Sequence, residues 1–129
     1  MSLRVGIDLV SVKSVEESIA CHGTRYLERV YTTVELDDSR DERGEPVAER
    51  LAARFAAKEA MRKALRIGDE AIPWRHIGVH RDQSGAPRLK LTGRARAAAD
   101  REGLRAVEVS LSHEGATAAA VVVAEVGAR

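Results

Sequence analysis

Hydrophobic residues alternate with polar or small ones at the start of the chain, at Leu3, Val5 and Ile7. This period of two is typical of a half-buried β-strand, so a strand is expected over residues 3–9. Ser14 then has the character of a helix cap. The same reading, with Gly and Pro as breaks, predicts helices over 14–21, 24–31, 47–66 and 94–102, and strands over 76–81, 88–92, 106–113 and 118–126.

The longest predicted helix, residues 47–66, contains no Gly or Pro and is rich in strong helix formers. Apolar residues from Val47 to Phe55 form one stripe, which Glu59 then continues as an ionic one. A helix that is apolar for two turns and then charged is expected to be half buried in a core and half lining a polar cleft. The simpler alternative is an i,i+4 pair of Glu59 with Lys63 on a solvated face.

Polar groups end two of the predicted strands. Asp8 stands where the first strand ends, which is a common place for a metal ligand and equally for a turn or cap residue. His113 follows the alternating apolar positions of 107–111, where a structural histidine is the alternative to a functional one. Ser110 and Ser112 point to the other face and are expected to be surface hydroxyls.

Strand hairpins beside separate helices indicate an α+β fold with a small antiparallel-type sheet and a long central helix, rather than a doubly wound α/β fold. At 129 residues the chain is expected to form a single domain, 1–129, with no internal repeat or dividing linker. Residues 35–46 are rich in acidic and basic side chains and are predicted to form a mobile charged loop ahead of the long helix.

The composition is that of a globular protein, with 44% hydrophobic and 32% charged residues. A net charge of +1 and an aromatic content of 3% argue against a nucleic-acid-binding surface. No apolar run approaches the ~20 residues of a membrane span, so no membrane partner is expected. The single cysteine, Cys21, cannot form an internal disulfide, which suits a reducing cytoplasm.

Three segments match one known family in order and spacing. They are Gly6-Ile7-Asp8, the run from Arg54 to Leu65 that contains Phe-Ala-Ala-Lys-Glu-Ala, and Ser110-Leu111-Ser112-His113. Together with the total length, they resemble the holo-[acyl-carrier-protein] synthase family, the small 4′-phosphopantetheinyl transferases. The resemblance implies the fold of that family and transfer of 4′-phosphopantetheine from coenzyme A to a serine hydroxyl of an apo acyl carrier protein, with release of 3′,5′-ADP.

Attack on a pyrophosphate phosphorus requires a site that neutralises several negative oxygens and positions an alcohol. Magnesium is the expected metal, because proteins usually hold it with one or two carboxylates plus phosphate and water. The resemblance assigns Asp8 and Glu59 to the metal, and the residue matching Lys63 contacts the pyrophosphate. Glu59, directly or through a metal-bound water, is the first choice for the general base, although a metal also lowers the pKa of bound water without a dedicated base.

The resemblance implies a coenzyme A site built from Arg54, Lys58, Lys63, Gly68, Gly85, Pro87 and His113. Positions matching Arg54 and His113 lie near the 3′-phosphate, and Lys58 is expected to hold phosphate as a mobile point charge. The Gly-x-Pro hairpin that begins at Gly85 runs beside the nucleotide in the family, and Gly68 matches a glycine near the phosphates. A plain turn and a helix C-cap are the simpler roles of these two glycines.

The start of the chain departs from the family pattern. Ser11 stands at an acidic position, and Ser14 replaces an arginine that helps to grip the acidic helix of the carrier protein. Lys13 and Arg25 are partial substitutes. The carrier is therefore left open among fatty-acid, polyketide and peptide pathways, and the resemblance further implies a homotrimer with each site at a subunit boundary.

Two other classes of function stay open at this point. One is an inactive relative that binds coenzyme A or a carrier protein without transfer. The other is a binding module in which Lys58, Arg62, Lys63 and Arg66 form a basic helix face for nucleic acid or an acidic protein. Such a module would depend on salt and not on magnesium.

Overall fold

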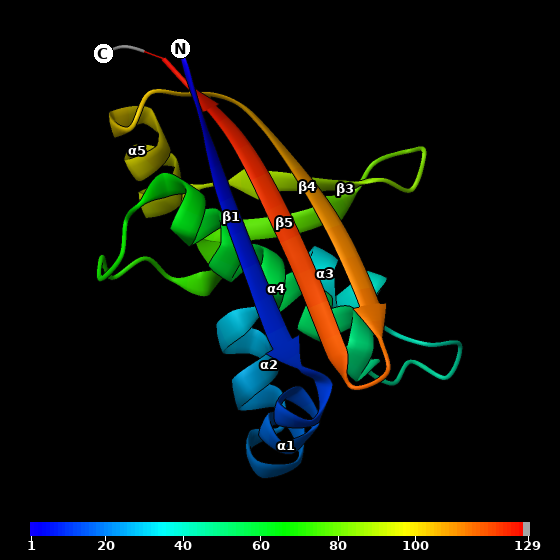
Figure 1. Ribbon diagram of the computed structural model, residues 1–129. Helices are drawn as coiled ribbons and strands as arrows, with labels where there is room; N and C mark the ends of the chain where they lie inside the picture. The colour runs from blue at the N-terminus through cyan, green and yellow to red at the C-terminus, as the bar shows by residue number, and fades with distance from the viewer. Residues whose placement is uncertain (128–129) are drawn as a thin grey trace.

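The computed structural model describes residues 1–127. A three-stranded antiparallel sheet in the order β1-β5-β4 lies against helix α4, and β2 and β3 form a separate two-stranded hairpin (Figure 1). The elements are β1 (Ser2–Ser11), α1 (Val12–His22), α2 (Thr24–Val30), α3 (Thr33–Asp38), α4 (Ala48–Leu65), η1 (Trp74–His76), β2 (Ile77–Arg81), β3 (Pro87–Leu91), α5 (Gly93–Arg101), β4 (Leu104–Glu114) and β5 (Thr117–Val126). This arrangement confirms the predicted α+β class, with a long central helix and antiparallel pairing.

Strand β5 is the centre of the larger sheet and explains how the sheet packs on α4. It pairs with β1 and with β4, both antiparallel, along its whole length. Its even-numbered residues from Ala118 to Val126 are buried, and those from Ala120 to Ala124 form one core with α4. Small side chains on the sheet therefore allow the helix to approach closely.

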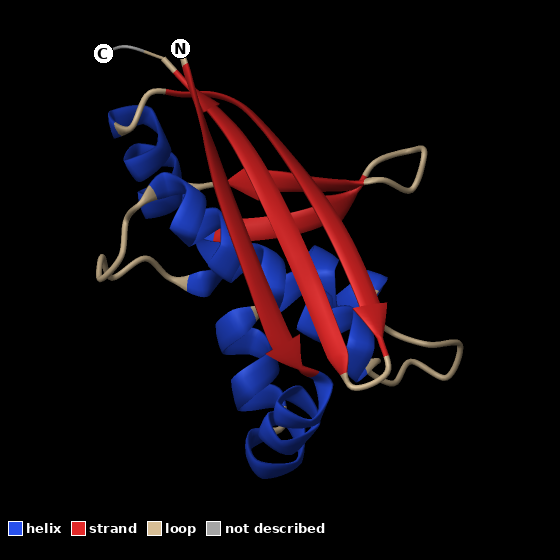
Figure 2. Cartoon of the chain, in the orientation of Figure 1, coloured by secondary structure: helices blue, strands red, loops and turns tan. Residues whose placement is uncertain are grey.

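Helix α4 contributes more residues to the core than any other element, because nearly all of its faces are covered. Its buried residues include Leu51 and Met61 and a series of alanines, and the sheet, the hairpin and α1 all contact it. Alanine combines a high helix propensity with a small volume, which suits a helix that is surrounded on several sides. Figure 2 shows α4 crossing behind the three long strands.

Strand β1 runs in the predicted place, but its apolar alternation faces away from the core. Leu3, Val5, Ile7 and Leu9 are exposed, whereas Gly6 is buried and faces α4. The half-buried face expected from these leucine, valine and isoleucine side chains is therefore open in the single chain. A Cβ built on Gly6 would lie 1.9 Å from the carbonyl oxygen of Ala60, so a glycine at this position is required for β1 to pack on α4.

Two local predictions are wrong. Ser11, not Ser14, is the N-cap of α1, since the Ser11 side chain accepts a hydrogen bond from the Ser14 backbone N–H. The predicted charged loop over 35–46 begins within helix α3, where Thr32 and Glu35 form a capping box. Glu35 is fully buried, because its carboxylate has buried partners from other elements.

Other element boundaries agree with the predictions to within two residues. In the part of the chain that the structure describes, none of the helices is both long and apolar enough to cross a membrane.

Candidate active site

The contact between β1 and α4 brings together residues from the two ends of the first half of the chain. Lys63 Nζ donates to Asp8 Oδ1 at 3.0 Å and to the Ile7 carbonyl oxygen at 2.9 Å. Asp8 follows Gly6 on the same face of β1, so the close approach at Gly6 sets the position of Asp8 over the last turns of α4. The ion pair of Lys63 is thus made with Asp8 rather than with Glu59 at i,i+4.

Glu59 lies one helical turn before Lys63 and is partly exposed. Partial burial raises the pKa of the Glu59 carboxyl, and the negative charge of Asp8 raises it further, while Arg62 and Lys63 act in the opposite direction. The carboxylates of Asp8 and Glu59 are therefore close enough for the charge of one to affect the ionisation of the other. Two carboxylates that repel each other are a site where a cation is favoured.

This pair of carboxylates fits magnesium better than it fits zinc or iron. Among residues 1–127, no group of three or more His, Cys, Asp or Glu side chains converges on one point. Magnesium takes one or two protein carboxylates and completes its shell with phosphate oxygens and water, whereas structural zinc needs four protein ligands. Asp8 and Glu59 are the residues that would hold it.

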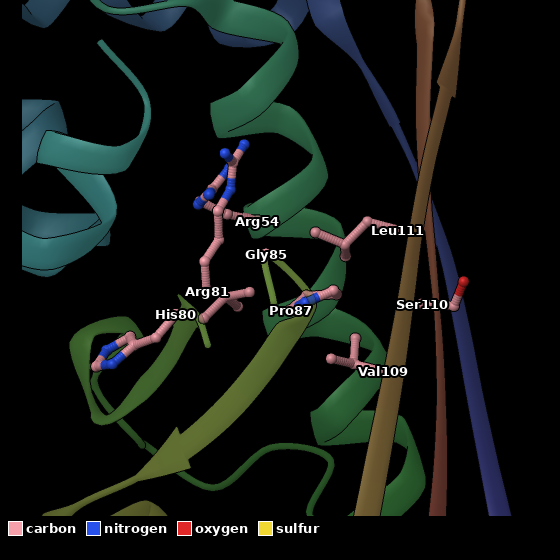
Figure 3. Close-up of a pocket in the computed structure, with 9 residues that line it drawn as sticks. Arg54, His80, Arg81, Gly85, Pro87, Val109, Ser110 and Leu111 are labelled. Atoms are coloured by element: carbon pink, nitrogen blue, oxygen red, sulfur yellow. The ribbon is translucent and has the colours of Figure 1, made fainter. Parts of the chain in front are cut away.

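A second part of the site is a cavity of about 260 Å³ between α4, the β2–β3 hairpin and β4. Figure 3 shows Arg54 and Arg81 extending toward each other across it, while the Ser110 hydroxyl points away. The lining residues are Arg54, Val79, His80, Arg81, Gly85, Pro87, Val109, Ser110 and Leu111. Gly85 and Pro87, which the resemblance assigns to coenzyme A, thus line the same cavity as Arg54.

Arg54 is the most confined charge in this cavity. Its side chain is only 3% exposed, its Nη1 donates to the Arg50 carbonyl oxygen at 3.1 Å, and its buried Nε has no hydrogen-bond partner among the described residues. Burial lowers the pKa of Arg54, and the charge of Arg81 lowers it further. An unpaired buried donor beside a second guanidinium indicates a subsite for an anion.

Arg81 was not among the residues singled out from the sequence. In the sequence it is only the last residue of a predicted strand, with no motif around it. Its role depends on the packing of β2 beside α4, a contact between residues 27 positions apart that no local pattern predicts.

Lys58 is not the mobile phosphate-binding charge that the sequence predicted. Its ammonium group is completely buried and donates to Glu35 Oε1 at 2.7 Å, to the Ile77 carbonyl oxygen at 2.6 Å and to the Trp74 carbonyl oxygen at 3.1 Å. These three acceptors use all three ammonium protons. Burial lowers the pKa of Lys58, and the neighbouring Glu35 carboxylate opposes that shift.

His113 and Gly68 lie apart from the cavity of Arg54. The exposed His113 ring pairs with Glu49, with its Nδ1 at 3.1 Å from Glu49 Oε2. Gly68 is exposed, with φ +45°, in the loop after α4, and its carbonyl oxygen accepts from Arg62 Nη2 at 2.7 Å. The left-handed C-cap of α4 is Arg66, so Gly68 is not the C-cap of that helix.

Comparisons with known proteins give a single answer. The family model of the 4′-phosphopantetheinyl transferase superfamily matches residues 4–122. The holo-[acyl-carrier-protein] synthase of Moorella thermoacetica is 46% identical over 125 residues, which is 95% of this chain and 94% of the relative.

Solved structures agree. The ACPS–CoA complex of Chronobacterium ammoniagenes superposes with a TM-score of 0.84 at 27% identity and covers 99% of this chain and 100% of that one. The holo-[acyl-carrier-protein] synthase of Helicobacter pylori in complex with coenzyme A gives a TM-score of 0.81 at 28% identity, over 94% and 99% of the two chains. The chain belongs to the 4′-phosphopantetheinyl transferase superfamily and, within it, to the holo-[acyl-carrier-protein] synthases.

Proposed function

We propose that this enzyme transfers 4′-phosphopantetheine from coenzyme A to a serine hydroxyl of an apo acyl carrier protein at the site formed by α4, β1 and the β2–β3 hairpin. The observation that carries the assignment is the Lys63–Asp8 contact beside Glu59, on the helix that also presents Arg54 to the cavity. Helix α4 thus sets the spacing of Glu59 and Lys63 from the proposed anion subsite at Arg54, and β1 adds the Asp8 carboxylate. Arg54 and Glu59 are five residues apart, about 7.5 Å along the helix axis.

In the reaction, the serine Oγ attacks the phosphorus that carries the pantetheine arm. The bond from that phosphorus to the bridging pyrophosphate oxygen breaks, and 3′,5′-ADP leaves with that oxygen. Lys63 neutralises the charge that grows on the pyrophosphate, and the Glu59 carboxylate accepts the serine proton. The 3.0 Å contact with Asp8 holds the Lys63 ammonium group beside Glu59 before substrate and metal bind.

Magnesium held by Asp8 and Glu59 would supply further charge neutralisation at the phosphate oxygens when bound. The support for this proposal is the donor set itself: two hard oxygen ligands of like charge that repel each other without a cation. A metal on Asp8 would weaken the contact of that carboxylate with Lys63, and the Lys63 ammonium group would then be available to a phosphate oxygen.

Two similar solved structures are complexes with coenzyme A. We place its nucleotide in the cavity lined by the β2–β3 hairpin, with a phosphomonoester against Arg54 and Arg81. Their two positive charges and the unpaired Arg54 Nε are the support for this orientation. Gly85, with φ +88°, forms the tip of the hairpin turn, and Pro87 begins β3.

A homotrimer remains part of the proposal. The outward face of β1 exposes Leu3, Val5, Ile7 and Leu9, and Val123 of β5 adjoins Val5 in the sheet. An apolar sheet face of this kind is expected to be covered by another protein surface. Copies of this chain would cover it and bring His113 of one copy toward the cavity of the next, which the single chain does not do.

Two serines stand at the start of α1, where the resemblance to the family expects charged residues. Ser11 caps α1 through its hydroxyl, and Ser14 lies in the first turn of that helix, so neither supplies a charge to an acidic partner. Arg25 and Arg29 line a neighbouring surface pocket on α2 and offer positive charge close by. A fatty-acid, polyketide or peptide carrier is compatible with this surface. A cytoplasmic setting stays a prediction from the single cysteine.

The alternatives are weaker. An inactive relative is not supported, since the similar proteins are named as synthases. A basic helix face for nucleic acid is incompatible with the buried position of Lys58 and with Arg62, which donates to the carbonyl oxygens of Gly68 and Glu70.

The test is intact-mass spectrometry of apo acyl carrier proteins incubated with the chain, coenzyme A and magnesium. A gain of one phosphopantetheine that EDTA prevents and Glu59→Gln abolishes is the expected result. No gain with fatty-acid, polyketide or peptide carriers would contradict the proposed transfer. Normal turnover by Glu59→Gln would show that Glu59 is neither the general base nor a required metal ligand.

A further inference from the structure

The ion pair of Lys58 with Glu35 is the most completely buried polar contact in the described part of the chain. Both side chains are 0% exposed, and Lys58 Nζ lies 2.7 Å from Glu35 Oε1. The mechanism above uses neither residue. Their charges therefore need another explanation than contact with substrate.

The pair links four elements through directional hydrogen bonds. Glu35, on α3, accepts from the Val79 backbone N–H through Oε2 at 2.9 Å and from the Thr32 N–H through Oε1 at 2.8 Å. Lys58, on α4, donates to the carbonyl oxygens of Ile77 and Trp74 as well as to Glu35. Strand β2 is thus held at a donor and at an acceptor two residues apart.

Stability alone does not account for a pair of this kind. Replacing a buried ion pair with apolar groups of similar size is often neutral or stabilising, because removing two charges from water is costly. What hydrogen-bonded charges add is a defined geometry between the groups they join. Here they fix the distance of β2 from α4, since they join the β2 backbone at Ile77 and Val79 to the side chain of Lys58 on that helix and to its partner Glu35.

The residues beside the pair are those of the proposed nucleotide site. Arg54 lies one helical turn before Lys58, and Arg81 follows Val79 by two residues on β2. Arg54, Val79 and Arg81 all line the same cavity. A shift of β2 relative to α4 would therefore change the separation of the two guanidinium groups directly.

We propose that Lys58 and Glu35 are positioning residues, which hold the β2–β3 hairpin against α4 so that Arg54 and Arg81 bind one phosphate group of the nucleotide together. This inference rests on the proposed function, because it takes the cavity to be the nucleotide site. It assigns no contact with substrate to either residue. Their loss acts on nucleotide binding through Arg81 and leaves Glu59 and Lys63 in place.

The test compares Glu35→Gln and the double variant Glu35→Met/Lys58→Met with the wild type, with Asp100→Asn as a control that breaks an exposed ion pair on α5. The probe is 3′,5′-ADP, and its Kd is measured by calorimetry alongside Tm. Steady-state kinetics then give kcat and the KM values for coenzyme A and for an apo carrier protein. Hydrogen exchange of residues 77–81 reports the hairpin directly.

The double variant is the decisive one, since it replaces both charges with apolar side chains of similar volume and is expected to fold. We expect a Tm modestly below that of the wild type, because the Val79 N–H and the Ile77 carbonyl lose their partners. Exchange of residues 77–81 should be faster, and the Kd for 3′,5′-ADP and the KM for coenzyme A should rise about tenfold or more. The value of kcat and the KM for the carrier should change less than about twofold. Glu35→Gln should show the same binding loss together with a lower Tm, because it leaves the Lys58 charge buried without its partner.

A double variant that binds 3′,5′-ADP as the wild type does would overturn the inference and leave the pair a merely structural one. The inference would also be overturned if the loss of 3′,5′-ADP binding followed the loss of Tm in both variants, with the more stable variant binding correspondingly better. These results are distinct from a failure of the proposed function, in which the wild type itself would bind neither 3′,5′-ADP nor coenzyme A.

Discussion

The ammonium nitrogen of Lys63 lies 3.0 Å from Asp8 Oδ1, although the two residues are 55 positions apart in the chain. The contact depends on the crossing of β1 over α4, and the crossing depends on the absence of a side chain at Gly6. The site proposed for phosphoryl transfer thus lies where a strand and a helix approach closely. Four predictions test this site and its surroundings.

Asp8→Asn is expected to raise the magnesium concentration that gives half-maximal transfer by about tenfold or more, because an amide is a weaker ligand than a carboxylate for a hard cation. The fold should persist, since Asp8 is at the surface of the β1–α4 contact. A metal titration of the transfer rate measures the effect. Asp100→Asn is the matched control, and equal titrations for the two variants would remove Asp8 from the metal site.

Arg81→Gln is expected to act only on donors that carry the 3′-phosphate. The KM for coenzyme A should rise about tenfold, the equivalent of one lost charge-assisted hydrogen bond of about 1.4 kcal/mol. The KM for 3′-dephospho-coenzyme A should be unchanged. Arg88→Gln is a control on the same hairpin, where Arg88 pairs with Asp82 and Glu108 instead of facing the cavity. An equal rise with both donors would place Arg81 elsewhere than at that phosphate.

Gly6→Ala is expected to destabilise the chain and to reduce transfer together. A Cβ at this position would lie 1.9 Å from the Ala60 carbonyl oxygen. The clash is between backbone segments, so β1 and α4 would have to move apart to relieve it. Overpacking of this kind costs about 1–3 kcal/mol. Chemical denaturation measures the change in the free energy of unfolding, with Ser2→Ala as an exposed control on the same strand. A transfer rate per folded molecule equal to that of the wild type would show that Asp8 does not need this approach.

Much of the fold and part of the site could be predicted because their signals are local. The composition of α4 predicts its helix, and its change from an apolar to an ionic stripe points to Glu59, which the structure places one turn from the Lys63–Asp8 contact. The alternation in β1 predicts the strand but not which face it buries, since outward apolar residues and an inward glycine produce the same period. Periodicity alone cannot distinguish a core from a face left open to another surface.

The features that could not be predicted are contacts between distant segments. Glu35 lies in a stretch that is charged on average, and only its hydrogen bond with Lys58, 23 positions later, shows that this carboxylate is buried. The same contact removes Lys58 from the phosphate site that its sequence motif implied. Arg81, by contrast, lines the cavity only because the end of β2 packs beside α4. Its neighbours in sequence do not indicate that position.

The turn of the β2–β3 hairpin should depend on pH through Asp82. Hydrogen bonds from Ser84 and Arg88 lower the pKa of this carboxyl from 3.8 to about 2. Because the folded pKa lies below the ordinary value, ionised Asp82 stabilises the fold above about pH 4, and this contribution is lost as the pH falls toward 2. Asp82→Asn removes it, so the Tm difference between wild type and variant should be constant above pH 5 and shrink between pH 4 and pH 2.5. Thermal melts across that range measure it, with Asp100→Asn as a control. A difference that stays constant through the whole range would mean that the turn does not depend on the charge of Asp82.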